Sequence, residues 1–210
     1  MPLGGTSNHF PRALLDEVGG WDPFNVTEDA DLGIRLARMG YVTQVLPSTT
    51  WEEAPRYFGQ WLRQRTRWLK GWMQTYLVHM RHPWRLFVEL GFFQGLGFHV
   101  FLGGLILSAL VHPVLYAVVA WNTVVTPARQ LPNVLGSVPF AMSMATLAVG
   151  YISAIGIGVI AVVRRRHRLV LAALQMPVCW LLISLAAYRA LWQLWRDPFL
   201  WEKTAHGKGS

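Results

Sequence analysis

The sequence predicts an α/β portion at the start of the chain, followed by interfacial and transmembrane helices. Charged residues recur throughout residues 1–89, whereas residues 90–128, 130–163 and 169–188 contain none. An uncharged stretch of about 20 residues is long enough to cross the hydrocarbon core of a bilayer. The composition agrees, because 53% of the chain is hydrophobic and 14% is charged, whereas about 25% is charged in a typical soluble domain.

The α/β portion begins with two predicted helices. Residues 11–18 have helical apolar spacing and stop at Gly19, because glycine readily adopts the left-handed conformation that ends a helix. Thr27 is placed to cap a second helix over residues 28–39. Residues 41–45 follow as a short candidate strand, which is consistent with an α/β layer. The inward-facing residues of the second helix are Leu32, Ile34, Leu36 and Ala37.

The run Thr27-Glu28-Asp29 has two interpretations on spacing alone. It can be an ordinary helix start, whose acidic residues complement the helix dipole. Alternatively, Asp29 is a base or a charge partner, because the backbone N–H groups of a first turn favour an ionised carboxylate. Asp29 and Asp31 also match Asp-x-Asp, which holds a divalent cation against a nucleotide diphosphate. We reject this match, because that motif ends a strand in a loop and these acids begin a helix.

A longer helix is predicted over residues 55–80. One broad side is aromatic and aliphatic and the other is basic, which is typical of a helix in the membrane interface with its basic side chains toward water. Its tryptophans are Trp61, Trp68 and Trp72, and its basic residues are Arg63, Arg67 and Lys70.

Three residues of this helix, Gln64, Arg67 and Trp68, have the spacing i, i+3, i+4 and can converge on one site. Arginine can bind a diphosphate through two hydrogen bonds, glutamine can bind a hydroxyl, and an indole face can stack on a sugar ring. The alternative is that the arginines of an interfacial helix simply contact lipid phosphates.

Two stretches are predicted to span the membrane, at residues 92–121 and 138–163. Residues 169–195 form either a third span or a re-entrant or interfacial segment, because Gln175 and Pro177 interrupt the apolar run. The outer flanks of the two spans are basic, which places those flanks in the cytosol. Anionic lipids therefore explain the net charge of +8 better than nucleic acid does, and no nucleic-acid partner is expected.

Taken together, these motifs resemble processive, inverting family-2 glycosyltransferases of the cellulose synthase and hyaluronan synthase type. The resemblance rests on Gly5-Thr6-Ser7-Asn8, on the run from Thr27 to Gly33, and on Gln64-Arg65-Thr66-Arg67-Trp68, in the order and spacing of that family. It implies that Asp29 is the catalytic base and that Glu28 and Thr27 support it. It also implies acceptor or diphosphate binding by a larger set, namely Gln64, Arg65, Arg67, Trp68, Gly5, Thr6 and Ser7.

The family's donor-binding half has no counterpart in this chain. The resemblance implies a nucleotide-sugar donor, most often a UDP-sugar, and Mg²⁺ or Mn²⁺ in the full-length enzyme, with metal ligands that are not in this chain. Domains that bind a nucleotide usually exceed about 100 residues, and the soluble zone here is shorter. We therefore expect the chain to be the C-terminal part of a longer enzyme and to be inactive alone.

The C-terminal tail resembles, more loosely, the gating loop that closes over bound nucleotide in these synthases. By that likeness, the residues that reach the active site are Trp201, Lys203, Thr204 and His206. The alternative is an exposed basic tail.

The expected protein is a multi-pass inner-membrane glycosyltransferase with a cytosolic catalytic side, which extends a polysaccharide or other glycan and contacts membrane lipids and export partners. One alternative is a non-processive transferase onto a lipid carrier. The other is a non-catalytic membrane subunit of a polysaccharide synthesis or export complex. The expected parts are the end of a glycosyltransferase-A domain at 1–54, interfacial helices at 55–90, a membrane region at 91–195 and the tail at 196–210.

Overall fold

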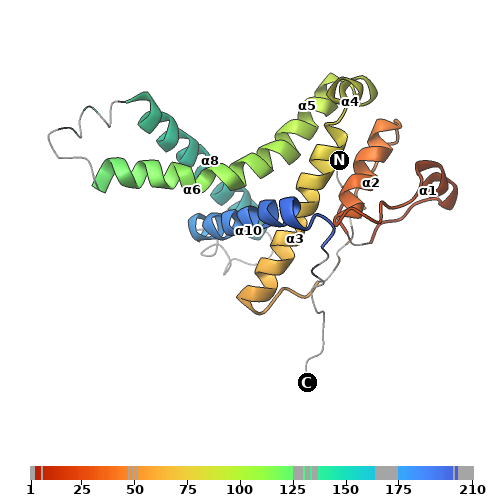
Figure 1. The fold of residues 1–210 in the computed structure, drawn as a ribbon, viewed down its shortest axis with the longest axis horizontal. Helices are drawn as coiled ribbons and strands as arrows, with labels where there is room; N and C mark the ends of the chain where they lie inside the picture. Colours follow the sequence, from red (N-terminus) through yellow and green to blue (C-terminus); the bar gives the residue numbers. More distant parts are fainter. Residues whose placement is uncertain are drawn as a thin grey trace. The chain divides into compact units, whose positions relative to one another are not determined.

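The computed structural model describes residues 3–5, 7–46, 48, 50, 52–124, 130, 133, 137–163, 175–200 and 202. All regular elements in this part of the chain are helical (Figure 1). The helices are α1 (Arg12–Val18), α2 (Glu28–Arg38), α3 (Phe58–His79), α4 (Pro83–Leu90), α5 (Phe92–Phe98), the π-helix η1 (His99–Gly103), α6 (Gly104–Val124), α8 (Val138–Val163) and α10 (Met176–Arg196).

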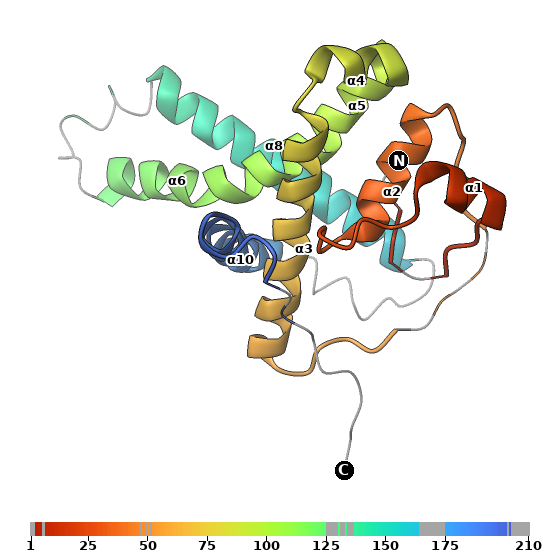
Figure 2. The same ribbon diagram turned by 45° about the vertical axis from the view of Figure 1, so that its right-hand side comes forward.

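The chain divides into two compact units. The first contains residues 1–107 together with 186–210, and the second contains residues 108–185. In the first unit, α2 lies beside α3 in the views of both Figure 1 and Figure 2, and the two helices are in contact.

The two short N-terminal helices form where the sequence places them. Gly19 has φ 81° and ψ 22° and ends α1 in the left-handed conformation. The apolar face of α2 is inward as expected, with Leu32, Ile34 and Leu36 all buried.

The strand expected at residues 41–45 is not formed, and the α/β part of the predicted fold class is therefore without support. This segment is irregular, and Val42 and Val45 are exposed. A strand is stable only when a neighbour offers the matching N–H and C=O groups, and no second strand occurs among the residues that the structure describes.

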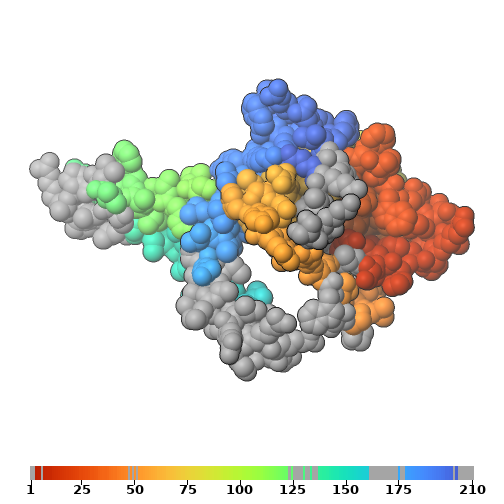
Figure 3. Space-filling view, turned by 90° about the horizontal axis from the view of Figure 1, so that it is seen from below, coloured from red at the N-terminus to blue at the C-terminus, as the bar shows by residue number. Residues whose placement is uncertain are grey.

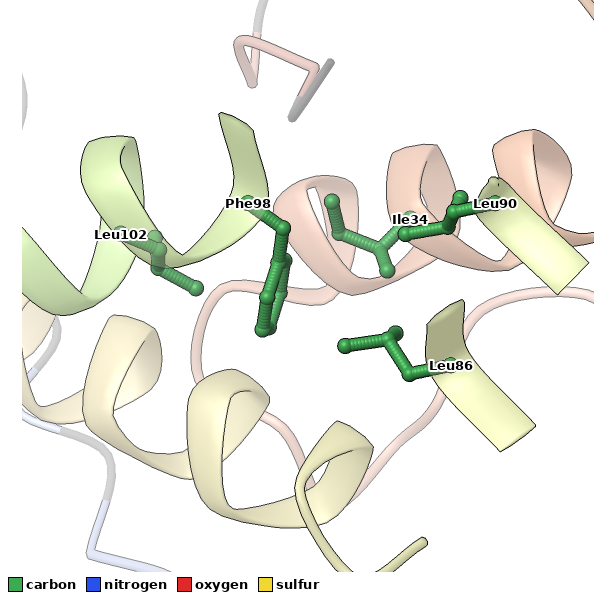
Figure 4. Packing of buried hydrophobic residues seen from close by; sticks show 5 residues of the cluster. All are labelled: Ile34, Leu86, Leu90, Phe98 and Leu102. Carbon is green, nitrogen blue, oxygen red and sulfur yellow. The ribbon is translucent and has the colours of Figure 1, made fainter. Parts of the chain in front are cut away.

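The core of the first unit lies where α4 and α5 return over α2 and α3. Gly91 separates α4 from α5 with φ 78° and ψ 161°, a combination that is essentially restricted to glycine. The turn brings the apolar side chains of four elements together, as Figure 4 shows. These buried residues are Ile34, Leu86, Leu90, Phe98 and Leu102.

A buried polar network connects α2 to α3 and α4. Asp31 accepts hydrogen bonds from Arg35 Nε (2.8 Å) and His79 Nε2 (3.0 Å). The other ring nitrogen of His79 lies 2.8 Å from Arg38, which also bonds Glu89. Because an arginine can only donate, His79 Nδ1 must be the acceptor, and His79 therefore carries its proton on Nε2.

Three helices of the described residues are long and apolar enough to cross a membrane: Phe92–Asn122, Val138–Ile160 and Val178–Arg196. The first two coincide with the predicted spans, and the third overlaps the segment for which two interpretations were open.

In the second unit, the Trp180 ring contacts the rings of His112 and Tyr151. The ring centroids are 4.7 and 4.5 Å from that of Trp180.

Candidate active site

The start of α2 docks on α3 through the close approach of Thr27 to Gly71. A Cβ atom on Gly71 would lie 2.3 Å from Thr27 Oγ1, so only glycine fits there. Thr27 precedes α2 as expected, but its side chain makes no capping hydrogen bond. It lies instead between Gly71 and Asn25, whose Oδ1 is 3.4 Å from Thr27 Oγ1. Thr27 thus fixes the approach of two helices.

The segment before α2 is also bound to α3 by side-chain amides. Asn25 donates to Thr75 Oγ1 (2.8 Å) and accepts from the Thr27 backbone N–H (3.0 Å). Gln74 Oε1 accepts from the Val26 N–H (3.3 Å). Asn25 and Thr27 are buried, and these bonds hold the entry to α2 in one position.

Asp29 lies at the N-terminal end of α2 beside the backbone of Gly5. A Cβ on Gly5 would be 3.1 Å from Asp29 Oδ2, which shows how closely the N-terminal segment approaches this carboxylate. Burial raises the pKa of Asp29, and the charge of Glu28 adds to this effect. The backbone N–H of Ala30 and the charge of Arg67 oppose it. The helix start alone would favour ionisation, but burial has the larger effect.

The residues Gln64, Arg67, Gly71 and Gln74 form one stripe along α3, because they are spaced i, i+3, i+7 and i+10. Gly71 and Gln74 contact the segment before Asp29, and Arg67 is close enough to favour the ionised form of Asp29. Gln64 and Arg67 of the expected acceptor motif therefore lie on the side of α3 that contacts the segment before Asp29, and Gln64 is about one turn further from Gly71 than Arg67 is.

Trp68 lies beside this stripe, with the Arg65 guanidinium 4.6 Å from its ring centroid. Arg65 also lies 5.9 Å from the Trp61 ring. Burial lowers the pKa of Arg65, and the ring faces provide it with cation–π contacts. Arg65 thus covers one face of the indole that was expected to stack on a sugar.

The remaining predicted residues of the N-terminal motif differ in position. Ser7 has a positive φ of 57° and lies 3.3 Å from the Thr50 hydroxyl, so it is directed toward the loop before α3. Thr6 lies outside the described residues.

Asp31 is engaged in the polar network and does not form an Asp-x-Asp metal pair with Asp29. Burial alone would raise the pKa of Asp31, but the hydrogen bond from His79 and the charge of Arg35 hold it below its ordinary value. Within the described ranges, no group of three or more His, Cys, Asp or Glu side chains is placed to hold a metal ion. The side chains described here thus do not fit a metal site, and the expectation of Mg²⁺ or Mn²⁺ for the full-length enzyme stays a prediction.

Lys70 contradicts the expectation that the basic side of α3 faces water. Its side chain is fully buried, and its ammonium donates to the backbone carbonyl of Leu200. Burial lowers the pKa of Lys70, while the charges of Glu202 and Asp197 oppose this. The reason for the error is that helical spacing separates polar from apolar faces but does not show which polar face another segment will cover.

The C-terminal residues are bound to α3 by this lysine and by Gln74, whose Nε2 donates to the Pro198 carbonyl (2.8 Å). Figure 3 shows the blue C-terminal residues directly against the orange residues of α3. Glu202 in turn binds Arg189 (2.8 Å) and Gln193 (3.1 Å) of α10. The predicted gating-loop residues Trp201, Lys203, Thr204 and His206 lie outside the described residues.

Sequence reasoning missed the residues that hold the site together: Gly71, Gln74, Thr75, Asn25 and Lys70. One signal was available for Gly71, because glycine inside a helix costs about 1 kcal/mol relative to alanine and usually has a packing reason. Gln74 and Lys70 carried no such signal, since their partners among the C-terminal residues lie more than 120 residues away along the chain.

Comparison with known proteins adds an independent observation. A family model described as "Glycosyl transferase family group 2" matches residues 1–201. The probable glycosyltransferase YdaM of Bacillus subtilis (strain 168) is 39% identical over 70 residues, which are 33% of this chain and 17% of that protein. The beta-monoglucosyldiacylglycerol synthase of Synechocystis sp. is 36% identical over 81 residues, which are 38% of this chain and 17% of that protein. The match thus spans 17% of the length of each relative. No solved structure matches the chain.

Proposed function

Because this chain belongs to glycosyl transferase family group 2, we propose that it carries the acceptor side of an inverting sugar transfer, with Asp29 as the general base. The observation that carries the proposal is the environment of Asp29, which lies close to the backbone of Gly5, is influenced by the charge of Arg67 and has a raised pKa. A carboxylate whose pKa is raised toward neutrality accepts a proton more readily than an exposed one.

In the proposed step, Asp29 takes the proton of an acceptor hydroxyl. The hydroxyl oxygen forms a bond to the anomeric carbon of the donor sugar. The bond from that carbon to the diphosphate breaks, and its electron pair leaves with the nucleoside diphosphate. General-base assistance of this kind contributes about 10²–10⁴-fold in rate.

The stripe on α3 supplies the supporting roles. Arg67 limits the rise of the Asp29 pKa and, in this proposal, binds diphosphate oxygens, while Gln64 on the same stripe binds a hydroxyl. Thr27 positions Asp29 through Gly71, and Glu28 adds negative charge beside the base. The nucleotide sugar, UDP-linked in this proposal, would approach from the part of the enzyme that supplies the donor pocket.

Two acceptors remain as candidates. The resemblance to polymerising synthases favours a growing glycan, held against Trp68. The similarity to a protein named beta-monoglucosyldiacylglycerol synthase favours a lipid acceptor that receives one sugar. Arg65 already covers one face of Trp68, which favours the lipid. We therefore take a membrane lipid as the preferred acceptor and a polysaccharide as the alternative.

The test uses membranes from cells that produce the full-length protein, supplied with radiolabelled UDP-sugar. Asp29→Asn is expected to lower incorporation about 10²–10⁴-fold without changing the amount of protein in the membrane. The matched control is Asp16→Asn, at an exposed carboxylate of α1, which is expected to keep wild-type activity. Unchanged incorporation in the Asp29 variant would exclude Asp29 as the base.

The type of product distinguishes the two acceptors. An organic-soluble product with one sugar indicates the lipid acceptor, whereas a polymer indicates the glycan.

We also propose that the C-terminus lies on the same side of the membrane as α3. The bond from Lys70 to Leu200 requires both to lie in one compartment, whereas three complete crossings would separate them. The segment α10 would then lie in the interface or re-enter, and the tail would be cytosolic. A reporter fused after Gly207 is expected to be active only in the cytosol, and a periplasmic signal would overturn this topology.

A further inference from the structure

A separate hollow of about 320 Å³ lies at the junction of α2, α4 and the first candidate span. Its floor consists of buried apolar residues, among them Ile34, Phe98 and Leu102. Figure 4 shows these side chains directed toward one another from three elements. Its rim contains exposed residues, namely Gln94, Gly97 and Phe101. The volume is at the lower end of the range for small-molecule sites, about 300–1,000 Å³.

The rim of this hollow belongs to a candidate membrane span. Gln94, Gly97 and Phe101 lie within Phe92–Asn122, which is long and apolar enough to cross a bilayer. On the same segment, Phe92 and Phe93 are 67% and 85% exposed. In a bilayer, large apolar side chains exposed on such a helix would face the acyl chains. A hollow that opens among them would therefore open toward acyl chains and not toward water.

Gln94 gives the hollow one polar feature. Among its described lining residues it is the only polar one, and it lies near the start of the candidate span, close to the depth of the lipid esters. Its amide has two N–H donors, which match the acceptor oxygens of an ester. An apolar hollow with one amide at its rim is complementary to a fatty acyl ester.

We propose that this hollow binds one acyl chain of a resident membrane glycerolipid, with Gln94 donating to the ester carbonyl. The lipid is resident and is not the sugar acceptor. Ala37, on the α2 wall of the hollow, follows Asp29 by about 12 Å along the helix axis. A lipid held there has its ester at Gln94 and not at the base, so the inference does not depend on the proposed function.

The experiment uses the full-length protein in nanodiscs of phosphatidylethanolamine and phosphatidylglycerol that contain a phosphatidylethanolamine with a diazirine near the end of one chain. After photolysis, labelled peptides are identified by mass spectrometry. The label is expected in residues 92–103 and in α2. Gly97→Leu adds a side chain to the lining of the hollow, and its Cβ would have no neighbour within 4 Å. It is expected to reduce this label about tenfold, equivalent to about 1.4 kcal/mol of lipid affinity.

The matched control is Gly156→Leu in α8, where a Cβ also has no neighbour within 4 Å. It is expected to leave the label unchanged. Equal labelling of the Gly97 variant and the wild type, or label spread evenly over all three candidate spans, would overturn the site. If an acceptor lipid displaced the probe at the same concentrations at which it formed product, the lipid in the hollow would be the acceptor and not a resident lipid.

A second variant keeps the proposal testable if Gly97→Leu does not accumulate. Gln94→Leu keeps the segment apolar and exposed but removes the amide. The label is expected to spread to neighbouring positions, because the ester carbonyl loses its partner. An unchanged label position would overturn the assigned role of Gln94.

Discussion

Asp29 and Asp31 are two residues apart on α2 and have opposite environments. The region around Asp29 is half-buried, with the backbone of Gly5 beside the carboxylate and the charge of Arg67 nearby, and the pKa of Asp29 is raised. The region around Asp31 is closed, with Arg35 and His79 on its two oxygens, and the pKa of Asp31 is lowered. Two similar carboxylates thus have different environments, because Asp29 lies beside the N-terminal segment and the charge of Arg67, whereas Asp31 uses both oxygens in the network that joins helices.

The difference shows why a short acidic motif should be interpreted residue by residue. In Asp29-Ala30-Asp31 the spacing alone suggests a metal pair, yet each acid belongs to a different environment. A helix turns about 100° per residue, so acids at i and i+2 point away from each other. The following predictions test this contrast, from the largest expected effect to the smallest.

The largest effect is expected on stability, from Asp31→Asn. Removing one partner of a buried ionic network costs about 3–5 kcal/mol. In the variant, Arg35 loses its carboxylate, and the amide keeps one acceptor oxygen for the two donors that bind Asp31. Thermal unfolding of the purified protein in detergent should show this loss. The exposed pair of Arg12 and Asp16 is the control, and Asp16→Asn should leave the unfolding temperature unchanged. Equal unfolding temperatures for the two variants would contradict a structural role for Asp31.

The same residue predicts a pH dependence of stability. Because the folded pKa of Asp31 is below its unfolded value, its contribution is present above the ordinary aspartate pKa of about 3.9. It is lost as the pH falls through the folded value. The acid limb of the unfolding curve should therefore flatten in Asp31→Asn. An unchanged limb would indicate that Asp31 is not the group that titrates.

An intermediate effect is expected from Gly71→Ala. The added methyl group would overlap Thr27, and overpacking of this kind costs about 1–3 kcal/mol. Because Thr27 directly precedes α2, the start of the helix should shift. The loss of transition-state stabilisation in sugar transfer should therefore exceed the loss in the free energy of unfolding. The control is Gly59→Ala in the same helix, where the nearest atom to the new Cβ is 3.8 Å away. Full activity in the Gly71 variant would contradict the docking of Thr27 on α3.

The smallest effect is expected from Arg67→Gln on the pH profile of transfer. Arg67 lowers the pKa of Asp29, so its removal should raise that pKa further. A base acts only when deprotonated, and the acid limb of kcat/KM should therefore move to higher pH. Arg63→Gln, at an exposed position of α3, should leave the limb in place. A limb that moves to lower pH would indicate that another group is the base.

The sequence predicted the local elements well, because they depend on short-range patterns. The bounds of α1 and α2, the inward positions of Leu32 and Ile34, and the apolar stretches of α6 and α8 all follow from spacing and composition. The strand at residues 41–45 failed because extended backbone is stable only with a partner strand, and β-branched residues cannot supply one.

The assembly of the site could not be predicted, because it depends on contacts between distant residues. Lys70 had the pattern of a solvent-facing residue, yet it is covered by Leu200. Thr27 had the pattern of a capping residue, yet it packs against Gly71. In each case the sequence indicated the residue type needed at that position but not the segment that would meet it.

The bridge made by Gln74 has a consequence for biosynthesis. It joins Val26, which is synthesised earlier than Gln74, to Pro198, which follows Gln74 by 124 residues. At about 5–20 residues per second, the ribosome needs about 6–25 s to make that interval. During this time α2 and α3 are already translated, while the segment that covers them does not yet exist. The site is therefore completed last, after the apolar helices have left the ribosome, and chains truncated before Pro198 should reach the membrane with this part of α3 uncovered.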